Sequence, residues 1–268
     1  MSVSKYATVF STGVQNTFVY RWNFLIRAVF GIVPLAGTVF VWQAIFHSRG
    51  ESVAGYDFSS MVFYFMCVLL ADNLVTPTED EWQISADIRD GQMSAFLTKP
   101  LDYQLYRFWL YGSARVVYAL VTLPIVSLVF FLMRERIVFP SEWITWVLAA
   151  LSLAMAGIIQ FLIAYSMAML AFWILEISTI VFIVYSFEYV LSGNMFPVDI
   201  MPAWLQAALK WLPFQYELFF PVAIFLERVN GRTLWEGLLI QTGWLVIMLL
   251  FSRWLWRRGV RKYQAVGG

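Results

Sequence analysis

The chain has very few of the side chains from which catalytic and metal sites are usually built. Its 268 residues include one cysteine, Cys67, and one histidine, His47. A single cysteine excludes a disulfide framework and a cysteine-based metal site within one chain. One histidine, with no obvious acid or nucleophile beside it, leaves little material for an H-E-x-x-H zinc site or for a Ser-His or Cys-His arrangement. The sequence therefore argues against these enzyme classes.

Charge is also scarce. Only 13% of the residues are charged and 61% are hydrophobic, whereas soluble domains have about 25% and roughly 45–50%. There is no basic, aromatic-interleaved patch outside the flanks of the apolar runs, so no nucleic-acid partner is expected. A G-x-x-x-x-G-K-[ST] motif is missing, so the chain does not bind nucleotide through a P-loop. The composition predicts an all-α polytopic membrane protein with about six spans of roughly 20 residues.

One polar stretch, residues 78–107, interrupts this apolar sequence. It holds nine charged residues, which are Glu79, Asp80, Glu81, Asp87, Arg89, Asp90, Lys99, Asp102 and Arg107. A charge at the centre of a bilayer costs at least ~2.5–3.5 kcal/mol, so the stretch must lie in water. We expect a helix over 81–96, around Gly91. We interpret the stretch as the segment through which a soluble partner moves the membrane part.

The apolar runs predict six membrane spans in a single domain, over residues 22–46, 58–77, 106–133, 143–172, 177–192 and 234–252. Residues 4–21 are mildly amphipathic, which favours an interfacial helix and equally a helix that packs on its neighbours. Residues 193–222 have prolines too closely spaced to allow a span, and Trp204 and Trp211 are typical of membrane interfaces. This segment is predicted to form re-entrant or interfacial helices.

The basic residues predict the orientation. Six spans put both termini and the polar stretch on one side, with twelve lysines and arginines against six on the other. The six are Arg49, Arg134, Arg136, Lys210, Arg228 and Arg232. Because loops rich in lysine and arginine stay in the cytoplasm, the termini and the polar stretch are predicted to be cytoplasmic. Polar residues near the N-terminus break up any apolar region of a cleavable signal.

Acidic residues within or near spans are candidates for function, and two are singled out here. Asp72 lies only seven residues before Glu79, so the favoured interpretation is that it reaches interfacial water. Glu188, in the outer part of the fifth span, is the better candidate. The alternative is a carboxylate that is hydrogen-bonded to the neighbouring re-entrant backbone. No span carries the string of acids expected of a proton or sodium relay.

Two motifs resemble those of a known family. Residues 87–93 (DIRDGQM) and 97–101 (LTKPL) are similar to a D-I-R-x-G-x-L…L-x-x-P loop. Residues 192–197 (SGNMFP), 201–205 (MPAWL) and 212–214 (LPF) are similar to a G-x-x-F-P…L-P-x-W-L…L-P-F pattern between the fifth and sixth spans. With its order of spans and loops, the chain resembles the ABC-2 type permease, the membrane subunit of ATP-binding-cassette exporters. Met93 and Met201 stand where the pattern has leucine.

The resemblance implies that the chain is not itself an enzyme and holds no cofactor. A separate ATPase would carry ATP and Mg²⁺, and a second copy or a related permease would complete the pore. The resemblance also implies a location in the bacterial plasma membrane. The functional residues that it implies fall into three groups. The contact with the ATPase would involve Glu81, Ile84, Asp87, Ile88, Arg89, Asp90 and Gly91 in the coupling loop, residues 79–100. An outer gate would involve Gly193, Phe196, Pro197, Pro202, Trp204 and Pro213, and the pathway would involve Asp72 and Glu188.

Two other functions remain open at this stage. A polytopic enzyme acting on membrane lipid would need a cluster of polar catalytic groups at one membrane depth. A membrane anchor or assembly protein would hold a partner without stimulating an ATPase. An ion-coupled secondary transporter is disfavoured because inverted repeats and buried charges are lacking. The aromatic, nearly uncharged spans suit an amphipathic, lipid-like, drug or peptide cargo.

Overall fold

A computed structural model describes residues 3–19, 21–49, 52–132 and 139–263. Over these residues the chain is helical and has no β-strand, apart from an isolated bridge between Val53 and Tyr56. In chain order the α-helices and 3₁₀ turns are α1 Val3–Val19, α2 Arg21–Arg49, α3 Phe58–Val75, α4 Asp80–Arg89, α5 Gln92–Leu97, α6 Tyr103–Leu132, α7 Trp143–Met169, η2 Leu170–Phe172, α8 Ser178–Leu191, η3 Val198–Ile200, α9 Ala203–Leu209, η4 Phe214–Tyr216, α10 Phe219–Phe225 and α11 Gly231–Lys262. The predicted all-α class is confirmed.

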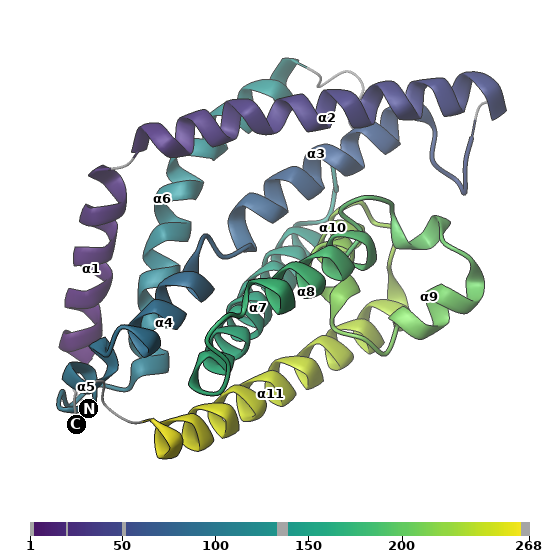
Figure 1. The fold of residues 1–268 in the computed structure, drawn as a ribbon. Coiled ribbons are helices and arrows are strands. Elements are labelled where there is room, and N and C mark those ends of the chain that lie inside the picture. The colour runs from purple at the N-terminus through teal and green to yellow at the C-terminus, as the bar shows by residue number, and fades with distance from the viewer. Residues whose placement is uncertain (1–2, 20, 50–51, 133–138, 264–268) are drawn as a thin grey trace.

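Helices α7 and α11 run between two ends of the molecule (Figure 1). One end, called here the terminal end, carries both chain termini with α4 and α5, and the other, the α9 end, carries the short helix α9. Helix α1 packs along α6, α11 packs along α7, and α2 lies against α3 and α6. The polar stretch and the proline-rich segment therefore lie at opposite ends.

Four helical stretches in the described part of the chain are long and apolar enough to cross a membrane, over residues 58–89, 103–128, 143–172 and 231–262. Helix α2, with 29 residues, covers the first predicted span. The fifth predicted span corresponds to α8, whose 14 residues extend only about 21 Å at 1.5 Å per residue. That is shorter than a hydrocarbon core of about 30 Å. The structure thus supports a multi-pass membrane protein.

The coupling loop forms two helices where the sequence predicted one region around Gly91. Helix α4 ends at Arg89, and α5 begins at Gln92. Gly91 has φ +78°, in the left-handed region. Glycine adopts this conformation without the steric cost of a Cβ atom, so the chain turns here and the helix does not continue.

The proline-rich segment folds as short helices, of which some lie at the surface and others are buried. The turn η3 follows Pro197, α9 follows Pro202 and η4 follows Pro213. Helix α9 is on the surface and leaves Trp204 exposed, whereas α10 is buried against α7 and α3. An apolar cluster surrounds α3 and α10, and a second one joins α4, α7 and α8 at the terminal end. The packed part of the proline-rich segment therefore extends to Phe225, beyond the predicted 193–222.

Candidate functional site

Helix α4, the centre of the predicted ATPase contact, is packed against the chain's own α7 and η2. Glu81, Ile84 and Ile88 point inward, with 3%, 0% and 4% of their surface exposed. They are therefore not available to a separate protein while α4 stays packed. Arg89 and Asp90 are exposed, and Gly91 is half-buried. The surface that α4 offers to a partner thus includes Arg89 and Asp90.

The carboxylate of Asp87 is bonded to other side chains of the same chain. The hydroxyl of Tyr103 donates to its carboxylate at 2.6 Å, and Arg107 forms an ion pair with it. The guanidinium of Arg107 is buried and also donates to the side-chain oxygen of Gln83 at 3.3 Å. These contacts fasten α4 to the first turns of α6. The arginine and the tyrosine were not predicted as part of the site, although both stand close to the D-I-R motif in the sequence.

The turn from α3 into α4 is held by Arg115 of α6. Its guanidinium donates to the carbonyl oxygen of Asn73 at 3.3 Å and also bonds to the carbonyl of Thr76 and the hydroxyl of Thr78. These bonds satisfy backbone acceptors that the end of a helix leaves without partners. Asp72 is half-buried beside them, and its carboxylate accepts from the Thr76 hydroxyl at 2.7 Å.

Glu188 lies in a buried polar cluster with two residues that the sequence analysis did not select. The amide nitrogen of Gln160, on α7, donates to Glu188 at 2.6 Å and to Glu217 at 3.3 Å. Glu217 follows η4 and precedes α10. The sequence does carry one signal for it, because Glu217 is an acid within an apolar run too short to be a span. The structure therefore joins α7, α8 and the proline-rich segment through polar side chains.

The predicted gate residues lie at or near the α9 end, in two environments. Gly193, Pro197 and Pro213 are buried, whereas Phe196, Pro202 and Trp204 are exposed. The hydroxyl of Tyr64, on α3, donates to the carbonyl of Gly193 at 2.7 Å, and the Phe219 amide donates to the carbonyl of Ser192 at 2.8 Å. The end of α8 is thereby tied to α3 and to the start of α10.

An ion pair outside the predicted site holds the α2–α3 loop to the proline-rich segment. Arg228 donates to Asp199 at 2.9 Å and to the Ala54 carbonyl at 3.1 Å, and its guanidinium lies 3.5 Å from the ring centre of Tyr56. The Tyr56 hydroxyl donates to Asp199 at 3.1 Å. Burial, together with the nearby Asp199 carboxylate, raises the pKa of Tyr56 above its usual value, so the hydroxyl stays protonated.

Arg228→Ala should release this loop from the proline-rich segment. Loss of charge-assisted hydrogen bonds and the ring contact costs about 2 kcal/mol. Hydrogen exchange of the purified chain in detergent should then be roughly 30-fold faster in residues 53–57. The matched control is Arg232→Ala, because the Arg232–Glu236 pair is exposed and exposed ion pairs contribute little to stability. Equal protection in the two variants would show that the ion pair does not hold the loop.

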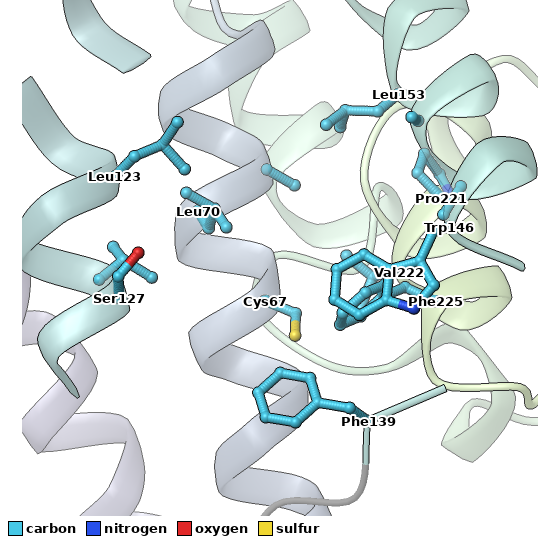
Figure 2. A pocket seen from close by; sticks show the side chains of 14 residues that line it. Cys67, Leu70, Leu123, Ser127, Phe139, Trp146, Leu153, Pro221, Val222 and Phe225 are labelled. Atoms are coloured by element: carbon cyan, nitrogen blue, oxygen red, sulfur yellow. The ribbon is translucent and has the colours of Figure 1, made fainter. Parts of the chain in front are cut away.

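An apolar pocket of about 380 Å³ lies between α3, α6, α7 and α10 (Figure 2). Figure 2 shows side chains from all four helices directed toward it, including Cys67, Leu123, Trp146, Leu153 and Phe225. Among the described residues, none that lines it is charged. Such a pocket can hold an apolar group. The polar side-chain groups among its described lining residues are the Cys67 thiol, the Ser127 hydroxyl and the Trp146 indole N–H, and none of them is an acid or a base.

The residues described by the structure include no group of three or more His, Cys, Asp or Glu side chains that could hold a metal ion. The structure shows an anchored polar helix with an exposed face, a buried carboxyl cluster and an apolar pocket.

Comparison with known proteins gives one family. The model described as "ABC-2 family transporter protein" matches residues 32–267, which is most of the chain. No individually curated protein matches the sequence. The match covers the coupling loop, the proline-rich segment and the carboxyl cluster.

Proposed function

The chain belongs to the ABC-2 transporter family and is a membrane permease of an ABC transporter, and we propose that it couples to a separate ATPase through residues 79–100. In this proposal it forms an export pathway with a second permease copy or a related permease. ATP and Mg²⁺ are bound by the ATPase chain. The protein lies in a plasma membrane, such as a bacterial inner membrane, in contact with lipid.

The observation that carries the proposal is the attachment of α4 to three other elements. Asp87 and Arg107 join it to α6, and the apolar side chains of Ile84 and Ile88 join it to the cluster around α7. The guanidinium of Arg89 donates to the carbonyl of Leu175 at 3.2 Å, in the turn before α8. A displacement of α4 by a partner would therefore be transmitted to α6, α7 and α8, as a two-state coupling element requires.

The orientation follows the distribution of basic residues. The termini, α4 and α5 share one end (Figure 1), which we assign to the cytoplasm because that side carries twelve of the eighteen basic residues. The α9 end is then extracytoplasmic, with short re-entrant helices that gate the pathway. Helix α8 exposes Phe182 and Phe187, and this apolar face is available to a second permease.

Purification of the tagged chain from its native host, followed by an ATPase assay, tests the coupling. Wild type should bring down a P-loop ATPase. The double variant Arg89→Ala/Asp90→Ala should reduce its recovery, or the stimulated hydrolysis, about tenfold or more, because polar contacts at the interface are removed. Asp87 stays intact, since its replacement would release α4 from α6. Because Arg89→Ala also removes the exposed bond to the Leu175 carbonyl, Asp90→Ala alone is measured beside the double variant and should lower recovery too.

The control variant removes an acid and a base at the other end, Glu142→Ala with Arg232→Ala, both exposed. It should keep wild-type recovery and hydrolysis. Wild-type preparations that contain no ATPase in several detergents would contradict the proposal. Equal losses in the two double variants would contradict the role of α4.

The alternative of a lipid-modifying membrane enzyme gains no support from the buried polar cluster. Gln160, Glu188 and Glu217 are at most 7% exposed. A lipid headgroup cannot reach these side chains without separation of α7, α8 and α10. Their enclosure favours a role inside the permease.

A further inference from the structure

The buried cluster of Gln160, Glu188 and Glu217 has more acceptors than donors. One amide nitrogen donates to both carboxyl groups. Within the described part of the chain, the second oxygen of each, Glu188 Oε2 and Glu217 Oε1, has no hydrogen-bond partner, and neither has the Gln160 side-chain oxygen. All three side chains are more than nine-tenths buried. Burying hydrogen-bond acceptors without donors costs free energy, so a proton or a cation bound to these oxygens would stabilise the folded chain.

The charged surroundings do not neutralise the two acids. The titratable groups that interact electrostatically with Glu188 are Asp72 on α3, Glu81 on α4 and Tyr185 on α8. All of these are acidic, and the group that faces Glu217 is Glu188 itself. Among the residues with described side chains, no lysine or arginine forms an ion pair with either glutamate.

We propose that Glu188 and Glu217 form a proton-binding site, in which at least one carboxyl group stays protonated at neutral pH. Two buried carboxylates that share one donor cannot both be ionised without a large desolvation and repulsion cost. A bound proton supplies the missing donor at Glu188 Oε2 or Glu217 Oε1. The site needs no metal ion and no reaction.

A groove with polar and apolar lining lies between α4 and α8, near the terminal end. It has a volume of about 720 Å³ and is lined by Glu81, Trp82, Tyr185 and Ser186, among others. Tyr185 interacts electrostatically with both Glu81 and Glu188. In the proposal this groove is the side from which the proton approaches Glu188, while Glu217 lies on the proline-rich segment. The proton would stabilise the packed positions of η4 against α8 and of α10 against α7.

Infrared difference spectroscopy of the purified full chain in lipid nanodiscs tests the proposal. At neutral pH the wild type should show the carbonyl stretch of a buried protonated carboxyl group, shifted by deuterium exchange and lost only at alkaline pH. Glu188→Gln and Glu217→Gln should each remove or shift this band. Glu142→Gln, at an exposed acid, should retain it.

Hydrogen exchange provides a second test of the proton-binding site that does not depend on the infrared spectrum. Hydrogen exchange in residues 214–225 of the wild type should rise about tenfold or more between neutral and alkaline pH, after correction for the intrinsic exchange rate. Glu217→Gln, which mimics the protonated acid, should stay protected. A band that persists in both glutamine variants would overturn the proposal. So would protection that depends on sodium and not on pH, since that result would identify a cation in place of the proton.

Discussion

Gly193→Ala is expected to lower the yield of folded permease more than the other single substitutions considered for this chain. Gly193 has φ +94°, a conformation that L side chains rarely adopt. A Cβ atom there would lie 2.7 Å from the Cβ of Phe219 and 2.7 Å from the hydroxyl of Tyr64. Backbone strain and overpacking of this kind cost about 2–5 kcal/mol together. That is a large part of the roughly 5–15 kcal/mol by which folded proteins are stable.

The residues around Gly193 cannot easily move to reduce this loss of stability. The Tyr64 hydroxyl would have to give up its bond to the Gly193 carbonyl, and Phe219 begins the buried helix α10. Movement of either residue would disturb the apolar cluster around α3 and α10. The expected result is a small or absent monodisperse peak in fluorescence-detected size-exclusion chromatography, with a lower melting temperature for any protein that remains.

Gly243→Ala is the matched control. Gly243 lies within α11, and a Cβ atom there would have no other atom within 4 Å. Because alanine is a better helix former than glycine by about 1 kcal/mol in water, this variant should fold at least as well as wild type. Similar chromatograms for the two variants would show that Gly193 is not restricted by packing.

The helical class and the positions of the main helices could be predicted from the sequence because they depend on local pattern. Long uncharged runs predict α3, α6, α7 and α11, and closely spaced prolines predict the short helices after α8. The sequence motif includes Gly193 but does not show why a glycine is needed there. The structure shows that a larger residue would collide with Phe219 and Tyr64, which are distant in the sequence.

The carboxyl cluster could not be predicted, since its members come from three segments. Gln160 is 28 residues from Glu188 and 57 from Glu217. The acids in the predicted spans are single and distributed, so no span resembles a relay, and the sequence does not indicate which acids meet across spans. The inward side of α4 was also missed. Its polar sequence indicated exposure, whereas Glu81 is buried and Asp87 is paired within the chain.

The second large effect is expected at Arg107, which anchors α4. Arg107→Ala removes the ion pair with Asp87 and the bond to Gln83, and its NεH no longer donates to the Tyr103 hydroxyl at 3.0 Å. Because Asp87 is partly exposed, water offsets some of the loss, and about 2–3 kcal/mol remains. Hydrogen exchange of residues 80–89 should be roughly 30-fold faster or more, while residues 219–225 keep their protection. Arg258→Ala, an exposed basic residue on α11, should leave both regions unchanged.

A double-mutant cycle with Asp87→Asn separates the two roles open to Asp87. If Asp87 acts by holding α4, then Asp87→Asn, Arg107→Ala and the double variant should weaken ATPase recovery by similar factors, because each removes the same anchor. If Asp87 instead contacts the ATPase directly, the two single effects should multiply in the double variant. Its bonds to Arg107 and Tyr103 favour the first result. On that outcome, the acid of the D-I-R motif sets the position of α4, and the exposed Arg89 and Asp90 provide the contact with the ATPase.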